Sequence, residues 1–423
     1  MERRHYRSIP LWKDVDEEQW NDWRWQIANR ITTVDVLSQV INLTDEEQEV
    51  IEKSLNQLRM AITPHYASLM DPDDRACPIR MRAVPTIQET EISPEDSVDP
   101  LHEDVDSPTP GLTHRYPDRV LFLVTDQCSM YCRHCTRRRM AGDTDKALPQ
   151  SEIDEMIAYV RGNRGVRDVL LSGGDPLTLT TDKLEYIVAR LHEIPHVEIV
   201  RYGSAVPVVL PQRITDKLLN MMKKYQPVWL NTHFNHPKEM TAESREALAK
   251  LADAGIVMGN QSVLLKGVND CPYIMKELVQ RLVQNRVRPY YMYQCDLSQG
   301  ISHFRTSIGK GIEIMEYLWG HTTGFAVPRF ILDVPGGVGK TPISPCYVLS
   351  RNERTTIFRN YEGVIAKYKE PEDNLSSGCP ENCEICNERK ERGLDPSVGV
   401  ASILDGDVEV LEPAHLARHE RNE

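Results

Sequence analysis

A chain of 423 residues, 40% of them hydrophobic, can bury one large core or about two to three smaller ones. The formal net charge of −13 is spread along the chain, which argues against a nucleic-acid-binding protein with a basic face. The N-terminus carries no apolar signal segment, and no run approaches the ~18 apolar residues of a membrane helix. We therefore expect a cytoplasmic protein without a membrane partner, whose ten cysteines are reduced.

Residues 1–112 are expected to form a helical extension followed by a linker. Apolar and charged residues mix in "WNDWRWQIANRI" and "TDEEQEVIEKSLNQLRMAI" with the spacing of amphipathic helices. The next stretch, "ETEISPEDSVDPLHEDVDSPTPG", is acidic and rich in proline, which is typical of a long surface loop.

Residues 113–334 alternate between strand-like and helix-like patterns. Short apolar runs recur about every thirty residues after a first long gap, as expected of strands buried on both faces. They are "RVLFLVT", "RDVLLSGG", "HVEIVRYG", "PVWLNTHF", "IVMGNQSVLL" and "RVRPYYMYQCD". Apolar stripes with helical spacing lie between them, such as Ile153, Met156, Ile157 and Val160. Ser151 and Thr215 are expected to cap two of the helices.

Strands that alternate with helices at this period form a parallel sheet. Six such units are too few for an eightfold barrel, so the sequence predicts the α/β class and a partial (β/α)6 TIM-like barrel. Polar residues follow the strands, in "SGGD", "NTHFNH", "NQS" and "QCD". Because the carboxyl ends of parallel strands meet at one edge of the sheet, these residues predict a single site.

The first strand leads directly into "CSMYCRHC", which contains Cys128, Cys132 and Cys135. Three thiolates are soft ligands that suit an iron–sulfur cluster or zinc. A four-iron cluster held by three cysteines has one iron without a protein ligand, where a substrate or cofactor can bind. On spacing alone, a structural metal site or cysteines without a shared role are alternatives.

The same cysteine spacing occurs again in "CPENCEIC", at Cys379, Cys383 and Cys386. Only the context separates the two groups. The first follows a strand and lies among arginines, whereas the second follows the loop "EDNLSSG" and lies among acids. A structural zinc site would need a fourth ligand, and a second iron–sulfur cluster is the alternative.

The glycine-rich segment "LDVPGGVGKTP" holds Lys340. A phosphate-binding P-loop would explain Gly339, Lys340 and Thr341, but Val334 occupies its first glycine position and two prolines follow. A glycine turn with a solvated lysine is a second reading. The third is a lysine on a flexible strap that forms a Schiff base with pyridoxal phosphate (PLP).

The cysteine loop behind a strand resembles that of the radical S-adenosylmethionine (SAM) superfamily, and "SGGD" resembles the strand-end glycine motif of these enzymes. With "PGGVGK" about two hundred residues later, nearly the whole chain resembles the lysine 2,3-aminomutase family. Further matching stretches include "WNDWRWQ", "DPLHEDVDSPTPGLTHRYPDRV", "VWLNTHFNHP", "NQSVLLKGVNDC" and "YYMYQCDLS". The chain departs from the pattern at Val338, which replaces a glycine, at Ala205, where an arginine is expected, and in the wider first gap of the last cysteine group.

The resemblance implies four cofactors and their residues. A [4Fe-4S] cluster is expected on Cys128, Cys132 and Cys135, and PLP on Lys340, with its phosphate near Arg115 and Arg119. SAM is expected at Gly173, Gly174, Asp175, His134, His233 and Gln261. Zinc is expected on Cys379, Cys383 and Cys386 with Cys271 of a neighbouring subunit. Residues 335–423 would then be a C-terminal segment for metal binding and oligomerisation.

The implied activity is that of an isomerase that interconverts L-lysine and L-β-lysine by radical 1,2-amino migration. Asp296 and Asp333 are candidates for the remote ammonium of the substrate, and Arg137 for its carboxylate. Arginine is an alternative substrate, because its guanidinium also suits paired carboxylates. A reductase or a flavodoxin- or ferredoxin-type electron donor is an expected partner, as is a homodimer or homotetramer. A nucleotide hydrolase and a non-enzymatic electron carrier are the alternatives from other classes.

Overall fold

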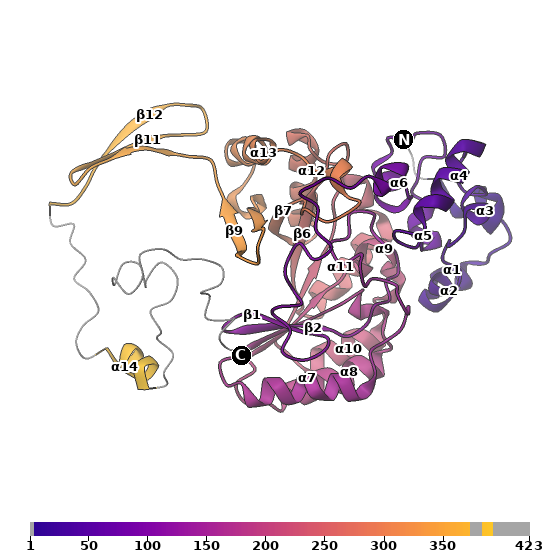
Figure 1. The fold of residues 1–423 in the computed structure, drawn as a ribbon, viewed down its shortest axis with the longest axis horizontal. Coiled ribbons are helices and arrows are strands. Elements are labelled where there is room, and N and C mark those ends of the chain that lie inside the picture. Colours follow the sequence, from indigo (N-terminus) through magenta and orange to yellow (C-terminus); the bar gives the residue numbers. More distant parts are fainter. Residues whose placement is uncertain (1–3, 373–382, 392–423) are drawn as a thin grey trace. The chain divides into compact units, whose positions relative to one another are not determined.

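The computed structural model describes residues 4–372 and 383–391, and the chain divides into two compact units, Met1–Ile343 and Ser344–Glu423. The first unit holds the N-terminal helices and a large sheet (Figure 1). The described part of the second unit holds an antiparallel sheet of β10 (Val348–Arg351), β11 (Thr355–Arg359) and β12 (Ile365–Lys369), and helix α14 (Glu384–Glu391).

The large sheet contains nine strands in sequence order, from β1 to β9. The strands β2 to β8 pair in parallel with their neighbours. At one edge of the sheet β1 pairs antiparallel with β2, and at the other edge β9 pairs antiparallel with β8. The bounds are β1 (Leu112–Tyr116), β2 (Arg119–Leu123), β3 (Asp168–Ser172), β4 (Ile199–Gly203), β5 (Val228–Thr232), β6 (Val257–Leu264), β7 (Arg288–Gln294), β8 (Arg329–Val334) and β9 (Gly339–Ile343). Because β1 and β9 do not pair with each other, the barrel is open, which confirms the predicted architecture. The six predicted strands are β2 to β7, and the seventh parallel strand, β8, was not predicted.

Helices connect the parallel strands and cover the outside of the sheet (Figure 1). They are α7 (Gln150–Gly162), α8 (Thr181–His192), α9 (Val206–Val209), α10 (Asp216–Lys224), α11 (Ala242–Asp253), α12 (Pro272–Gln284) and α13 (Ile308–His321). The predicted stripe of α7 is buried, and the Thr215 side chain caps α10 by accepting from the Leu218 amide. The Ser151 prediction is wrong, because α7 begins at Gln150, after Pro149.

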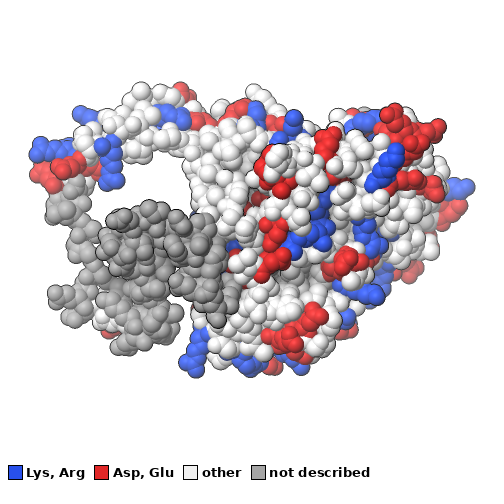
Figure 2. All heavy atoms as spheres, viewed as in Figure 1, with Lys and Arg blue, Asp and Glu red and all other residues white. Residues whose placement is uncertain are grey.

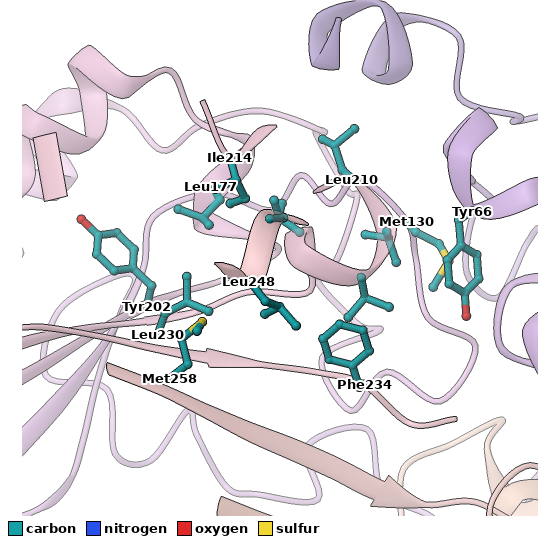
Figure 3. Close-up of a cluster of buried hydrophobic side chains, with 14 of the residues drawn as sticks. Tyr66, Met130, Leu177, Tyr202, Leu210, Ile214, Leu230, Phe234, Leu248 and Met258 are labelled. Carbon is teal, nitrogen blue, oxygen red and sulfur yellow. The ribbon is translucent and has the colours of Figure 1, made fainter. Parts of the chain in front are cut away.

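The N-terminal extension contains α1 (Glu17–Asn21), α2 (Trp23–Ala28), α3 (Val34–Leu37), α4 (Asp45–Ser54), α5 (Pro64–Ala67) and α6 (Pro78–Ala83). Its buried side chains share one hydrophobic cluster with those of the barrel. Figure 3 shows this cluster, with Tyr66 of α5 and Met130 of the cysteine loop among residues from the sheet, such as Leu230 and Met258. The extension is therefore part of the same packed unit as the barrel.

The surface drawn in Figure 2 carries acidic and basic side chains interspersed with each other. Over the described ranges of the chain, no helix is both long and apolar enough to cross a bilayer.

Candidate active site

The barrel encloses a cavity of about 780 Å³. Every residue predicted to bind the cluster, SAM, PLP or the substrate contributes to its wall: Cys128, Cys132, Cys135, His134, Arg137, Gly173, Gly174, Asp175, His233, Gln261, Asp296, Asp333, Lys340, Arg115 and Arg119. These side chains come from different strand ends and loops, as the parallel topology led us to expect. The structure thus brings them into one place, while their individual roles stay predictions.

The loop that follows β2 is held from behind by the N-terminal extension. The Arg30 guanidinium donates to the carbonyl oxygen of Cys128 at 2.6 Å and forms an ion pair with Asp145 at 2.7 Å. The amide of Tyr131 donates to the carbonyl oxygen of Ala61 at 3.2 Å, and the Tyr131 hydroxyl donates to Asp145. Two distant segments therefore fix the backbone of the cysteine loop.

The Arg133 side chain points away from the cavity and secures the same loop. It is fully buried and pairs with Glu89, which also pairs with Arg138 at 2.7 Å. Its guanidinium donates further to the carbonyl oxygens of Leu58 and Arg59 at 3.0 and 3.1 Å. The guanidinium of Arg133 therefore bonds to the N-terminal extension. The neighbouring Cys132 and Cys135, by contrast, line the cavity.

The three cysteines are free, half-buried thiols. Burial raises the pKa of all three, and Arg82 acts in the opposite direction on Cys132. Within the described residues, no three His, Cys, Asp or Glu side chains converge to hold a single metal ion. An iron–sulfur cluster makes a different demand, since each thiolate binds a separate iron. Three thiols on one loop that line one cavity are the donor set that such a cluster takes.

The glycines of "SGGD" allow the end of β3 to approach the cysteine loop closely. Gly173 has a φ of +122°, and a Cβ there would lie 2.3 Å from the carbonyl oxygen of Thr125. A Cβ at Gly174 would lie 2.3 Å from the carbonyl oxygen of Gln127. The Gly174 and Asp175 amides donate to these two oxygens at 2.6 and 2.7 Å. The motif therefore binds the cysteine loop as well as lining the cavity.

The carboxylate of Asp175 is buried and joins the loop after β4 to the "SGGD" turn. It accepts hydrogen bonds from the Ser204 hydroxyl at 2.7 Å, the Ala205 amide at 2.8 Å and the Leu177 amide at 3.0 Å. Burial raises the pKa of Asp175 to about 6, against the effect of these donors. Ala205 contributes through its backbone, so this contact does not require the arginine expected there.

The residues predicted at the SAM site include two neutral imidazoles. Burial lowers the pKa of His134 well below its usual range and that of His233 to about 4, and the Arg82 guanidinium lowers both further. Within the described part of the chain, the buried Nδ1 of His134 has no hydrogen-bond partner. The Gln261 amide donates to the Tyr293 hydroxyl at 3.4 Å. The pocket therefore offers neutral polar groups beside the cysteines.

Lys340 lies on β9, which runs antiparallel to β8. The connecting strap contains Gly336 and Gly337 with positive φ, and Gly339 with φ of +99°. The Lys340 amide donates to the Tyr116 hydroxyl at 3.1 Å, and its Nζ lies 3.2 Å from Oδ2 of Asp333. The P-loop alternative is wrong, because this lysine follows a turn into a strand and not the start of a helix.

Two half-buried aspartates, Asp296 and Asp333, line the cavity together with Lys340. Burial, and secondarily the negative charge of Asp333, raise the pKa of Asp296 to about 7, against the opposing effect of Lys340. One carboxylate oxygen of each aspartate is buried without a hydrogen-bond partner in the described ranges. An ammonium group, with three N–H donors, would satisfy both oxygens.

The predicted arginines already have acidic partners. Arg137 binds Glu103 through its Nε and Nη2 atoms, at 3.0 and 2.6 Å. Arg115 pairs with Asp106 at 2.7 Å and donates to the carbonyl oxygen of Leu101. These buried acids lie in the segment predicted to be a surface linker, so this segment forms part of the cavity wall. Arg119 pairs with Asp118 at 2.7 Å and lies over the Tyr116 ring at 4.0 Å.

Sequence analysis missed Glu103, Tyr116 and Arg82, all of which line the cavity. Glu103 and Tyr116 lie in "DPLHEDVDSPTPGLTHRYPDRV", a stretch noted only for its family resemblance and its acidity. Arg82 lies in α6 and carried no motif.

The cysteines predicted to bind zinc belong to both units of the chain. Cys271 is half-buried at the start of α12 and is not among the residues that line the cavity. Cys383 is half-buried and precedes α14, in the second unit. Cys379 and the side chain of Cys386 lie outside the described residues. The zinc assignment therefore stays a prediction.

An open parallel barrel whose first parallel strand leads into a Cys-x3-Cys-x2-Cys loop at a cavity defines a radical SAM enzyme. Residues 122–278 match the family model "Radical SAM superfamily", which implies a [4Fe-4S] cluster and SAM. Residues 315–423 match the model "Lysine-2,3-aminomutase".

The chain is similar along nearly its whole length to proteins named as aminomutases. It is 59% identical to L-lysine 2,3-aminomutase of Clostridium subterminale over 98% of this chain and 99% of that one. It is 58% identical to the enzyme of the same name from Acetoanaerobium sticklandii, over 96% and 97%. A glutamate 2,3-aminomutase of Clostridioides difficile is 49% identical over 84% of each chain. The chain belongs to the lysine 2,3-aminomutase family.

Proposed function

We propose that this protein is an isomerase that interconverts L-lysine and L-β-lysine by radical 1,2-amino migration, with a [4Fe-4S] cluster, SAM and PLP. The observation that carries the choice of lysine is the pair Asp296 and Asp333 at the cavity, each with one buried carboxylate oxygen that has no hydrogen-bond partner among the described residues. When both acids are ionised, two carboxylates beside one lysine leave an excess negative charge, which a cationic substrate side chain would neutralise.

The ammonium of lysine fits this site better than the alternatives. A glutamate side chain would bring a third carboxylate to two existing ones, and the repulsion would oppose its binding. Arginine shares the positive charge of lysine. However, an ammonium group already sits against Asp333, since Lys340 Nζ lies 3.2 Å from its Oδ2. The carboxylates therefore accept the chemical group that the lysine side chain carries.

Other residues of the cavity would bind and orient the remaining groups. When bound, the cluster and SAM supply a radical that removes a substrate hydrogen atom, and PLP supplies the π system through which nitrogen moves between neighbouring carbons. Cys128, Cys132 and Cys135 would hold the cluster, and Lys340 would hold PLP with its phosphate near Arg115 and Arg119. Arg137 would orient the substrate carboxylate towards the other groups that line the cavity.

The proposal extends to partners beyond this cavity. Zinc would be held by Cys379, Cys383 and Cys386 of one chain and Cys271 of a neighbouring one, which would make the protein a homo-oligomer. A flavodoxin- or ferredoxin-type protein, or a reductase, would supply the electron.

The test is an anaerobic assay of the reduced protein with SAM, PLP and either L-lysine, L-arginine or L-glutamate, with products separated by chromatography. We expect β-lysine from lysine and no β-amino acid from glutamate. Lys340→Ala should abolish the reaction and the absorbance of the PLP imine. Equal or faster turnover of arginine would overturn the lysine assignment, and ATP hydrolysis without iron would overturn the whole proposal.

A further inference from the structure

Arg82 is a cation at the back of the cysteine loop that no predicted role includes. It belongs to α6, its side chain is fully buried, and it contributes to the wall of the cavity. Its Nη2 lies 4.0 Å from Sγ of Cys132. Within the described residues, its buried Nε has no hydrogen-bond partner. A donor and a positive charge are therefore available beside the thiols.

The other side of the guanidinium is fixed by a buried network. Its Nη1 contacts the carboxylate of Glu239 and lies 3.1 Å from the Tyr66 hydroxyl, which donates to Glu239 at 2.7 Å. Glu239 lies in the turn Pro237–Glu239 and also accepts from the amides of Asn235 and His236, at 2.6 and 3.0 Å. Four donors thus bind the Glu239 carboxylate, and this network holds the Arg82 guanidinium next to Cys132.

We propose that Arg82 is a positioning residue that raises the reduction potential of the iron–sulfur cluster, by presenting its guanidinium to the sulfur of Cys132. This inference rests on the proposed function, because it requires a cluster on the three cysteines. Reduction adds one electron, and therefore one negative charge, to the cluster. A fixed cation next to a ligating sulfur stabilises the reduced form, and hydrogen bonds to sulfur have the same effect. The electron comes from a one-electron donor protein.

The experiment is a potentiometric titration of the anaerobic protein, monitored by electron paramagnetic resonance, with iron and sulfide contents measured on every sample. At the potential that reduces half of the parent cluster, the ratio of reduced to oxidised cluster should fall about tenfold in Arg82→Met, which corresponds to about 59 mV for one electron. Arg82→Lys keeps the positive charge but loses the paired N–H donors of the guanidinium, so its ratio should lie between those of the parent protein and Arg82→Met.

Two further variants separate this effect from damage to the fold. Tyr66→Phe removes a member of the network and keeps the cation, so it should leave the ratio unchanged. The double variant Arg82→Met with Glu239→Gln also removes the unpaired carboxylate that Arg82→Met alone leaves in the core, so its ratio should fall in the same direction but by less than in Arg82→Met.

An unchanged ratio in iron-replete Arg82→Met and in the double variant would overturn the inference. So would an equal shift in Tyr66→Phe, or weaker SAM binding at an unchanged potential, which would assign Arg82 to SAM instead. If the parent protein itself binds no four-iron cluster, the proposed function fails first. The iron and sulfide contents therefore distinguish the two failures.

Discussion

Lys340 and Asp333 face each other across the β8–β9 hairpin, as a registered pair with Nζ 3.2 Å from Oδ2. The side chain of Asp333 is only 6% exposed, whereas that of Lys340 is 31% exposed, so the carboxylate is shielded from water and the amine keeps access to the cavity. If Asp333 receives the substrate ammonium, then Lys340 occupies this position before substrate arrives. The hairpin then links the amine that would hold PLP to the carboxylate that would select the substrate.

Asp333→Asn should weaken lysine turnover strongly. The change removes a charge-assisted hydrogen bond, which is worth about 1.5–3 kcal/mol, so kcat/KM for lysine should fall about 10- to 100-fold. The control is Asp253→Asn, which removes an exposed acid paired with Arg286 and should leave turnover unchanged. Steady-state kinetics with lysine measure both variants, and an unchanged kcat/KM in Asp333→Asn would remove this residue from the substrate site.

The affinity for lysine should depend on the protonation of Asp296. Burial, and then Asp333, raise the pKa of Asp296 to about 7, so its carboxyl group is neutral below this pH and negative above it. Only the negative form attracts an ammonium, and kcat/KM for lysine should therefore rise as the pH increases through about 7. In Asp333→Asn the midpoint should move to lower pH, because the like charge is lost. A pH profile that is the same in Asp296→Asn would contradict this assignment.

The glycine motif should not tolerate a side chain. Gly173→Ala places a Cβ 2.3 Å from the Thr125 carbonyl oxygen at a strained φ of +122°, which should lower the free energy of unfolding by about 2 to 4 kcal/mol. The displaced cysteine loop should also lose iron. Gly162→Ala, at the end of α7 with no atom within 4 Å of its new Cβ, is the matched control and should be neutral or slightly stabilising. Thermal unfolding and iron content are the measurements.

Glu103 should act on substrate binding through Arg137. It is buried, which favours its neutral form, but Arg137 holds the pKa of Glu103 below its ordinary value. It occupies the Nε and Nη2 side of the guanidinium, so Nη1 is the donor left for a substrate carboxylate. Glu103→Gln should loosen this orientation and raise KM for lysine roughly tenfold, with a smaller effect on kcat.

The neighbouring acid provides the control for this prediction. Asp104 is 70% exposed and pairs with Arg139, so Asp104→Asn should change neither constant. If Glu103→Gln instead lowered kcat and left KM for lysine unchanged, the variant would have a general structural defect and the prediction would be contradicted.

Local patterns predicted the elements that pack by local rules. The apolar stripe of α7 is buried as its spacing indicates, and the six apolar runs are strands. The strand β8 could not be predicted in this way, because its short apolar run leads directly into the glycine strap and the combined stretch has the composition of a loop. Contacts across long sequence separations could not be predicted in the same way. The burial of Glu103 depends on Arg137, 34 residues later, whereas its own surroundings are polar and rich in proline.

The residues that contact the cysteine loop from the N-terminal extension have a position in the chain that matters for biosynthesis. Arg30, Ala61, Arg82 and Glu89 all precede the loop in the chain, and each holds or touches it from behind. During translation these groups leave the ribosome before the cysteines do, whereas the strands β3 to β9 that complete the barrel emerge afterwards. A nascent chain that ends after the cysteines would therefore already contain the supporting side of their loop, but not the strands that complete the cavity around the thiols.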